Sequence, residues 1–389
     1  MTSSDPRRQL LFELFAIALK RVDGRRCTAE ALRAVLGPQP GRTWTAAIGK
    51  AASSMALGAH DALGAAQERL LLITKDGHVA AEARALTGAE ILESAHPIPD
   101  ARSIRAGERL LSWVQELPPD VTPLFLVSGG ASSLTEALVA GVTLEDLKRL
   151  NDAGIASGVG IAELNANRAR VSRIKAGRLT ALLGARAARA LFISDVPGDD
   201  PAVIGSGLLG PAAEGVDHVE RTVIASIDDA VAAVAAAAEA RGYSVRAPAG
   251  ERFDGDARRL GVRFAHELDL YPEAVHVWGG ESVVQLPDEP GKGGRNQHLA
   301  LSAGRMIAGR HDLFLLAAGT DGTDGPTLDA GALVDGDTCA RIALAELDVE
   351  ACLNRADSNT ALAQAGDLIH TGPTGTNVGD LVIGLKCGS

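Results

Sequence analysis

Cysteine is scarce in this sequence, and its spacing is not that of a cysteine-based framework. Only four cysteines occur among 389 residues, and no two of them form a CxxC pair or another spacing typical of a metal site. Reduced thiols of this kind suit the cytosol, so we expect a cytoplasmic protein.

Basic charge and long apolar runs are also lacking. The 38 lysines and arginines are outnumbered by 49 acidic residues, which gives a formal net charge of -11. Nucleic acids and anionic membranes require a basic footprint, so we expect neither as a partner. No apolar run is long enough to span a bilayer. With 46% hydrophobic and 22% charged residues, the composition is that of a folded globular protein.

The N-terminal apolar stretch Leu10–Leu19 resembles a signal peptide but predicts a helix. Glu13 interrupts the stretch, and no small-residue cleavage site follows it. Apolar residues recur at helical spacing, with Asp5 as a plausible N-cap and Pro6 at the first helical position. We therefore predict an amphipathic helix that docks on the rest of the protein.

Short apolar runs alternate with helical stretches along the chain. The runs cover residues 45–48, 124–127, 191–193, 275–278 and 314–317, and each ends in a glycine-rich or acidic turn. Buried strands that alternate with helices predict an α/β protein with parallel sheets covered on both faces. The length predicts two domains, and a shift to proline, glycine and charge at 247–256 marks a linker or an exposed loop near their boundary.

The turn Ser128–Ser133 lies between a predicted strand and a predicted helix, where α/β proteins place their ligands. It holds two glycines, Gly129 and Gly130, and three hydroxyl groups, those of Ser128, Ser132 and Ser133. Glycine lets the backbone approach an anion, and a helix N-terminus attracts negative charge. A phosphate cradle and a simple tight turn are both compatible with this pattern.

Two basic residues stand at similar positions. The loop 291–297 uses Gly293 and Gly294 to deliver Arg295 to the start of a helix, where its guanidinium group can bind phosphate or carboxylate oxygens. We expect Lys292 of this loop to face solvent. Lys50 directly follows a predicted strand, where its ammonium group can neutralise the charge that moves in phosphoryl transfer.

Two acidic turns, 194–200 and 319–325, supply candidate metal ligands. We select Asp195, Asp321 and Asp324, because Mg²⁺ prefers hard oxygen ligands and keeps several waters. Aspartate also caps helices and stabilises ordinary turns, so we expect some of these carboxylates to be structural. In other turns, Glu281 and Asn377 can contact a substrate or nucleotide hydroxyl, or can satisfy backbone groups instead.

Taken together, these turns make the chain similar to the glycerate 2-kinase family, whose members were often labelled hydroxypyruvate reductases. The resemblance rests on seven segments in the expected order: 47–51, 96–100, 128–133, 194–201, 291–297, 318–327 and 371–378. It implies an N-terminal Rossmann-like α/β/α domain at 1–235, a C-terminal MOFRL-like α/β domain at 236–389, and an active site in the cleft between them.

The resemblance also implies a reaction. The family transfers the γ-phosphoryl group of ATP to the 2-hydroxyl of D-glycerate with Mg²⁺, which gives 2-phosphoglycerate. ATP and a small hydroxy acid are thus the expected partners, and a homodimer is a possible assembly that the sequence does not decide. Lys50 and Arg295 match family positions around the transferred phosphoryl group and the substrate. We assign Lys50 to transition-state charge, Arg295 to phosphate or carboxylate, and Asp195 to the metal or the hydroxyl group.

The chain departs from the family pattern in two places. Ala176 replaces a glycine that relatives commonly have, and an alanine strains the turn if the position needs a positive φ. Leu208 and Leu209 replace a usual Pro-Thr pair, and the segment 211–218 is short. We expect these changes to bear on the identity of the substrate more than on phosphoryl transfer.

Three other functions remain as alternatives. An NAD(P)H-dependent hydroxypyruvate reductase would match the older family label, but the chain has no GxGxxG between a strand and a helix with an acidic residue about twenty positions later. A kinase of a related sugar acid, or a non-catalytic sensor of phosphate or sugar phosphate, would use the same turns. The acidic turns in addition to Lys50 and Arg295 favour catalysis over sensing.

Overall fold

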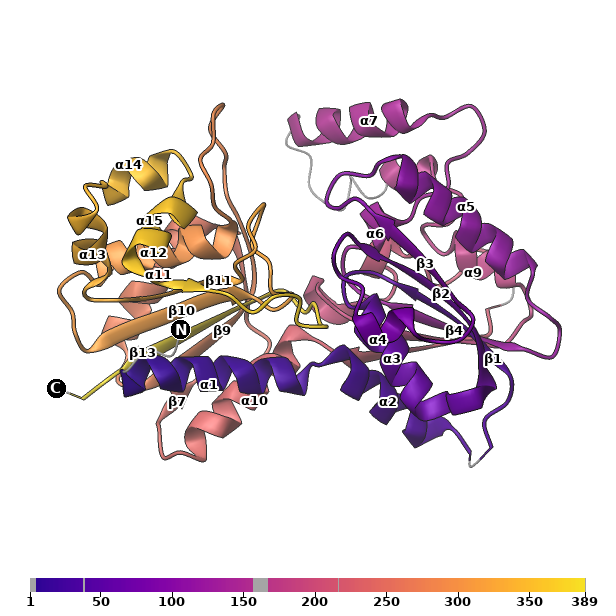
Figure 1. The fold of residues 1–389 in the computed structure, drawn as a ribbon, viewed down its shortest axis with the longest axis horizontal. Coiled ribbons are helices and arrows are strands. Elements are labelled where there is room, and N and C mark those ends of the chain that lie inside the picture. The colour runs from indigo at the N-terminus through magenta and orange to yellow at the C-terminus, as the bar shows by residue number, and fades with distance from the viewer. Residues whose placement is uncertain (1–4, 38, 157–166, 216, 389) are drawn as a thin grey trace. The chain divides into compact units, whose positions relative to one another are not determined.

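The chain folds into two compact units, which Figure 1 shows in a computed structural model that describes residues 5–37, 39–156, 167–215 and 217–388. The first, here called the parallel unit, comprises Asp23–Ser226 and Gly375–Asn377. The second, here called the mixed unit, comprises Met1–Val22, Ile227–Thr374 and Val378–Ser389. In the described part of the chain, no helix has the length and apolar character needed to cross a membrane.

The parallel unit is built on six parallel strands in the order β3-β2-β1-β4-β5-β6. The strands are β1 (Thr43–Ile48), β2 (Gln67–Lys75), β3 (Ala89–Ser94), β4 (Thr122–Val127), β5 (Ala188–Ile193) and β6 (Val219–Ala225). The helices are α2 (Gly24–Val35), α3 (Ala52–Leu63), α4 (Ala81–Arg84), α5 (Ala101–Gln115), α6 (Ala131–Leu134), α7 (Leu144–Ala156) and α9 (Arg178–Leu183), with short 3-10 turns η1 (Gly64–Ala66), η2 (Pro197–Asp199) and η3 (Ile204–Ser206).

Helices cover both faces of this sheet, as predicted for strands that read as continuous apolar runs. Alternate residues of β1, namely Trp44, Ala46 and Ile48, belong to the same buried cluster as Leu110 and Trp113 of α5. α3 packs on the opposite face (Figure 1). The sheet therefore has the α/β/α sandwich architecture that the sequence predicted.

The strand order sets the place where a ligand is expected. It is the order of dinucleotide-binding Rossmann sheets, in which the chain changes direction between the first and fourth strands. Ligands bind beyond the carboxyl ends of the strands at this switch point. Gly49 and Lys50 follow β1 there, and the turn Ser128–Ser133 follows β4.

The mixed unit has a seven-stranded sheet with the path β12-β11-β10-β13-β9-β7, and β8 pairs with β9. Its strands are β7 (Val245–Arg246), β8 (Arg252–Asp256), β9 (Val275–Val283), β10 (Leu313–Gly319), β11 (Gly331–Asp335), β12 (Leu368–Ile369) and β13 (Asp380–Lys386). Its helices are α1 (Pro6–Arg21), α10 (Ile227–Glu239), α11 (Ala257–Leu270), α12 (Arg295–Met306), α13 (Thr338–Leu344), α14 (Val349–Asn354) and α15 (Ser358–Ala365).

This second sheet corrects the expectation of purely parallel sheets. β10 pairs antiparallel with both β11 and β13, and β13 pairs antiparallel with β9. The connection between β10 and β11, residues 320–330, contains no helix. Two consecutive parallel strands require a long crossover connection, usually with a helix. The connection here has no helix, so β11 runs antiparallel to β10.

Helix α1 forms where the sequence predicted it, and Asp5 caps it as predicted. The Asp5 side chain accepts a hydrogen bond from the Arg7 backbone N–H at 2.8 Å, and Leu11, Leu14 and Phe15 lie on its buried face. The helix packs on α10. The N-terminal segment is therefore a docking helix.

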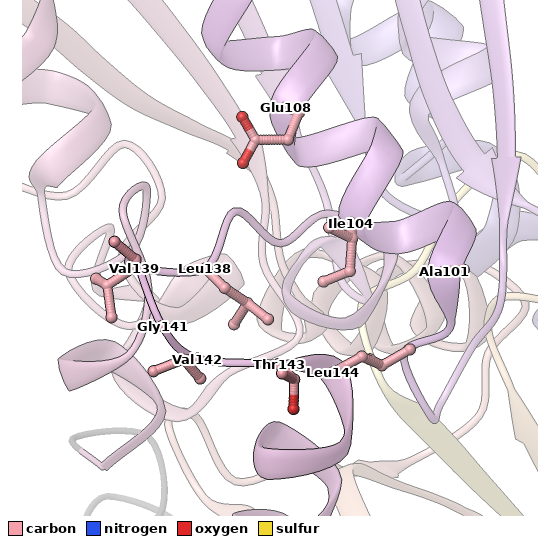
Figure 2. A pocket seen from close by; sticks show the side chains of 10 residues that line it. Ala101, Ile104, Glu108, Leu138, Val139, Gly141, Val142, Thr143 and Leu144 are labelled. Carbon is pink, nitrogen blue, oxygen red and sulfur yellow. The ribbon is translucent and has the colours of Figure 1, made fainter.

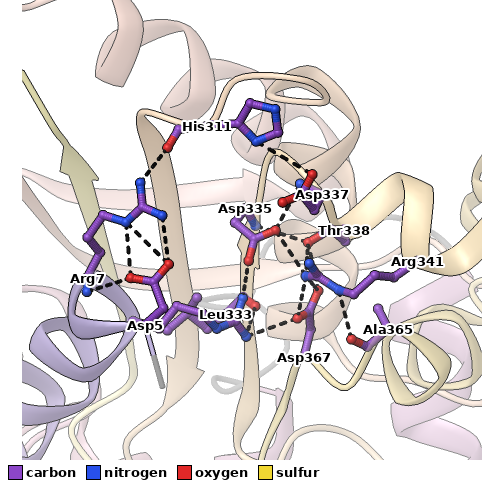
Figure 3. A network of polar contacts seen from close by, with 11 residues as sticks. Asp5, Arg7, His311, Leu333, Asp335, Asp337, Thr338, Arg341, Ala365 and Asp367 are labelled. Atoms are coloured by element: carbon purple, nitrogen blue, oxygen red, sulfur yellow. Dashed lines mark hydrogen bonds and ion pairs between the residues drawn. The ribbon is translucent and has the colours of Figure 1, made fainter. Parts of the chain in front are cut away.

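Ion pairs between buried side chains connect α1 to the sheet and to α13 of the mixed unit (Figure 3). Arg8 pairs with Asp335 and, at 2.9 Å, with Asp367, whose side chain is 1% exposed. Arg341 reaches the same Asp367 at 2.8 Å. Burial raises the pKa of Asp367, although both arginines oppose the shift. These ion pairs hold α1 in the mixed unit. The predicted division at 235/236 instead grouped α1 with the parallel sheet, and it falls inside α10.

Candidate active site

Lys50 is held at the switch point by contacts between the loops after β1 and β4. Gly49 has a φ of 129°, and a Cβ atom at this position would overlap the Ser128 hydroxyl group. The Ser128 Oγ accepts a hydrogen bond from the Ala51 N–H at 3.0 Å, and the Lys50 N–H donates to the Gly129 carbonyl at 3.0 Å. The backbone at Lys50 is therefore fixed directly beside the Gly129–Gly130 turn.

Four polar side chains surround Gly129 and Gly130. A Cβ atom at Gly129 would overlap the Asp195 carboxylate and the Asn377 amide. A Cβ atom at Gly130 would lie 3.1 Å from the His96 ring and 3.2 Å from the Lys50 side chain.

Asn377 Nδ2 also donates to Asp195 Oδ2 at 2.9 Å. The predicted residues Lys50, Asp195 and Asn377 thus lie together around the two glycines, and His96 joins them. Sequence reasoning missed His96 as a site residue, although it opens one of the seven family segments.

The serines of this turn are engaged within the protein. Ser128 is fully buried, Ser133 Oγ donates to the Gly130 carbonyl at 3.1 Å, and Ser132 Oγ shares a hydrogen bond of 2.7 Å with Ser206 Oγ. The helix that follows, α6, has four residues and supplies little of the dipole that a full helix would offer. The hydroxyl groups therefore brace the loop, which favours the tight-turn interpretation for them.

A buried ion pair supports the same loop and was not predicted. Lys175 Nζ donates to Glu136 Oε2 at 2.6 Å and to the Ser132 carbonyl at 2.8 Å, and the two side chains are 3% and 0% exposed. Ser172 Oγ donates to the second Glu136 oxygen at 2.6 Å. Burial lowers the pKa of Lys175, against the effect of Glu136.

Both departures from the family pattern lie in structural positions. Ala176 has a φ of 52°, in the left-handed region, so the predicted strain is present. Leu208 and Leu209 are 1% and 0% exposed and belong to the hydrophobic core of the parallel unit. The replaced pair therefore lies in the core of the parallel unit.

In the mixed unit, Arg295 begins α12 and is held by two carboxylates. Its Nε lies 2.8 Å from Asp380 Oδ2, its Nη2 donates to Asp380 Oδ1 at 3.0 Å, and its Nη1 donates to Glu281. Burial lowers the pKa of Arg295, but Asp380 and Glu281 outweigh burial and the pKa is raised. Asp380 was not predicted, and the available signal was an aspartate that opens an otherwise apolar strand.

Asp324 caps the same helix, which differs from its predicted role as a metal ligand. Its two oxygens accept hydrogen bonds from the N–H groups of Asn296 at 3.1 Å and Gln297 at 2.8 Å. Burial raises the pKa of Asp324 to about 7. A Cβ atom at Gly294 would overlap the Asp324 carboxylate, and one at Gly293 would overlap the Ser358 hydroxyl group. These glycines therefore permit close packing of the loop.

The remaining carboxylates fit a metal ion that needs few protein ligands. Asp321 lies in a turn where its Oδ1 accepts from the Thr323 N–H at 2.9 Å, and Asp195 faces Gly129. Among the described residues, no group of three or more histidines, cysteines or acidic residues could enclose a metal. Mg²⁺ bound to a nucleotide keeps several waters and uses one or two carboxylates, so a single carboxylate, Asp195 or Asp321, is enough.

The best-defined cavities lie elsewhere in each unit. Figure 2 shows one of about 490 Å³ in the parallel unit, lined by Ala101, Ile104, Glu108 and the loop 138–144. Another, of about 1020 Å³, lies beside α1 in the mixed unit. None of the predicted site residues lines either cavity.

Fold and site together define a two-domain α/β protein with polar loops at the switch point of a Rossmann-like sheet. The protein-family model described as "Domain of unknown function (DUF4147)" matches residues 10–238 of this chain, and the model of the MOFRL family matches residues 274–380. The chain belongs to this DUF4147–MOFRL family, and the resemblance to glycerate 2-kinases predicted from seven segments is confirmed.

Its relatives cover nearly the whole chain. It is 35% identical to "D-glycerate 2-kinase" of Thermotoga maritima, over 87% of this chain and 89% of that protein. It is 36% identical to a "Putative hydroxypyruvate reductase" of Agrobacterium vitis, over 88% and 98% of the two chains. The crystal structure of the Thermotoga maritima glycerate kinase superposes with a TM-score of 0.83 at 34% identity, covering 97% of this chain and 99% of that one.

Proposed function

We propose that this protein is an ATP-dependent glycerate 2-kinase, which transfers the γ-phosphoryl group of ATP to the 2-hydroxyl of D-glycerate. The observation that carries the proposal is the gathering of Lys50, Asp195 and Asn377 around Gly129, at the switch point of the parallel sheet. The relative named D-glycerate 2-kinase supports the choice of acceptor.

The parallel unit supplies the groups suited to phosphoryl transfer. The Lys50 ammonium group neutralises charge that develops on the transferred phosphoryl group. Gly130 has no side chain, so an anion can approach its backbone beside the Lys50 side chain and the His96 ring. Asp195, held by Asn377 at 2.9 Å, orients the acceptor hydroxyl.

The mixed unit supplies Arg295, which binds the phosphate or the glycerate carboxylate through its guanidinium group. Mg²⁺, when bound with ATP, neutralises phosphate charge. Asp195 or Asp321 is the carboxylate proposed to hold it, whereas Asp324 caps α12 with both oxygens.

Turnover measured on the full chain tests the proposal. We expect ADP release that requires both Mg²⁺ and D-glycerate, and a product whose phosphorus NMR spectrum shows phosphate on carbon 2. Lys50→Ala should reduce kcat about 1,000-fold, the loss typical of removing one stabilising group. Lys292→Ala, which removes an exposed lysine, is the matched control and should keep normal turnover. Equal activity of the two variants would remove Lys50 from the mechanism.

Assays on the same full chain also test two competing functions. The strand order and the Agrobacterium vitis relative favour testing a hydroxypyruvate reductase, yet the turn after β1 reads Gly49-Lys50-Ala51-Ala52 and lacks the glycine fingerprint. NADH oxidation with hydroxypyruvate, and no ADP release with any acid, would establish it instead. ADP release with erythronate or tartronate but not with glycerate would identify a kinase of a related acid.

A further inference from the structure

The two carboxylates that hold Arg295 differ sharply in burial. Asp380 has a side chain that is 0% exposed, and it contacts Arg295 through both of its oxygens. Glu281 has a side chain that is 51% exposed, and it contacts only Nη1 among the guanidinium nitrogens. One edge of the guanidinium group is thus held in the protein interior, and the other meets a carboxylate at the surface.

Asp380 is fixed by more than Arg295. It accepts hydrogen bonds from Asn296 Nδ2 at 3.0 Å and from the Ser282 N–H at 3.4 Å. In the sheet it lies opposite Gly280, directly before Glu281 on β9. Removing this buried anion would take one acceptor from a buried amide and one from the arginine, which is costly.

Glu281 has the character of an exchangeable partner. Exposed ion pairs are weak, because each partner can return to water at little cost. A phosphate or carboxylate group that reaches Arg295 can bind the same Nη1 edge with comparable or better geometry. The anion and Glu281 cannot occupy that edge together, because two negative groups in contact repel each other.

We propose that Glu281 occupies the position on Arg295 that the anionic group of the substrate takes, and that Asp380 is the positioning residue that keeps the guanidinium group in place during this exchange. The inference rests on the proposed function, since it assigns Arg295 to an anionic substrate. Glu281 is then a competitor of the substrate rather than one of its ligands, which revises the role predicted from sequence.

Binding of simple anions to the full chain tests the exchange independently of turnover. Glu281→Gln keeps the shape and removes the charge, so it should lower the Kd for the displacing anion about 2- to 5-fold, the measured worth of an exposed pair. Glu289→Gln removes the same charge from an exposed position in the following loop and should leave the Kd unchanged. Calorimetric titration with inorganic phosphate and, separately, with D-glycerate shows whether phosphate or carboxylate is the competing group.

Kinetics of the same variants test positioning. Asp380→Asn should reduce kcat about 100-fold, the effect of a misplaced catalytic group, while Glu281→Gln should lower KM and retain kcat. A purely structural role would change the melting temperature of both variants without this opposite split. If Asp380→Asn does not fold, the Glu281→Gln titration alone decides the exchange.

The outcomes separate the inference from the proposed function. Weaker anion binding by Glu281→Gln, or binding equal to that of Glu289→Gln, would overturn the exchange even in an active kinase. If the protein phosphorylates no acid and Glu281→Gln still binds phosphate or glycerate more tightly, the exchange stands and the proposed function fails.

Discussion

The two units hold their principal cations in different ways. In the parallel unit, Lys50 is placed by backbone contacts and by glycines that leave no room for a side chain, as at Gly49 and Gly129. In the mixed unit, Arg295 is placed by charge, between the buried Asp380 and the exposed Glu281. The comparison teaches that steric fit positions one cation and electrostatics the other, so different substitutions should disturb the two sites.

Removing the arginine should give the largest loss of stability. Arg295→Ala leaves Asp380 buried without its cation, and breaking a buried pair costs about 3–5 kcal/mol. Because the arginine side chain is 34% exposed, we expect the lower end, about 3 kcal/mol, in the free energy of unfolding by urea. The control, Arg305→Ala on the same helix α12, breaks an exposed pair with Glu350 and should cost less than about 1 kcal/mol. Equal losses would show that charge does not organise this site.

A single methyl group should disturb the other site. Gly129 lacks a positive φ, so alanine is compatible with its backbone, but the new Cβ atom would overlap Asp195 and Asn377. We expect Gly129→Ala to reduce kcat about 100-fold, the effect of a small misplacement of catalytic groups.

Gly37→Ala provides the matched control, because a Cβ atom at Gly37 meets nothing within 4 Å. Steady-state turnover of both variants measures the difference. Normal turnover of Gly129→Ala would mean that Asp195 and Asn377 move aside without consequence, and would break the steric half of the comparison.

The buried helix cap makes the mixed unit sensitive to pH. Burial raises the pKa of Asp324 to about 7 in the folded protein, above its ordinary value of 3.8. The folded state therefore binds more protons than the unfolded state between these values, and the contribution to stability falls as pH rises from about 4 through 7.

Asp324→Asn removes this ionisation and should flatten that fall. Urea unfolding at several pH values in the same window measures it, with Asp288→Asn at an exposed site as the control. Parallel stability curves for the wild type and Asp324→Asn would contradict a raised pKa.

Local patterns in the sequence predicted which loops matter, while pairings between distant residues stayed hidden. The turns after the strands and the first helix follow from periodicity and glycine placement, and both were confirmed. The seven segments carried a resemblance, and the family that it named was confirmed. Lys175 and Glu136 are separated by 39 positions, and Arg295 and Asp380 by 85. No periodicity links such residues, because only the packed sheet brings them together.

The same limit applies to the roles of single residues. For the serines of 128–133 the sequence left a phosphate cradle and a tight turn open, and their hydroxyl groups form hydrogen bonds within the turn and to neighbouring loops. Asp324 was predicted to bind metal because it lies in an acidic turn, but the helix it caps comes from an earlier part of the chain. Sequence position gave the loop correctly, whereas the partner of each side chain depends on tertiary packing.

The alanine at position 176, where relatives commonly have glycine, gives the prediction with the smallest expected effect. It is also the prediction that follows most directly from the sequence. A non-glycine residue in the left-handed region costs about 1–2 kcal/mol, part of which glycine gives back through its greater freedom in the unfolded chain. We expect Ala176→Gly to stabilise the protein by about 0.5–1 kcal/mol, with a melting temperature higher by roughly 1–2 °C and unchanged turnover.

The reverse change at the neighbouring residue sharpens this test. Gly177 has a φ of 74°, and a Cβ atom there would overlap the Pro211 carbonyl group, so Gly177→Ala should destabilise the protein. If Ala176→Gly lowers the melting temperature, the methyl group contributes more through packing than the backbone loses through strain. Steric fit would then outweigh backbone conformation at this position of the parallel unit.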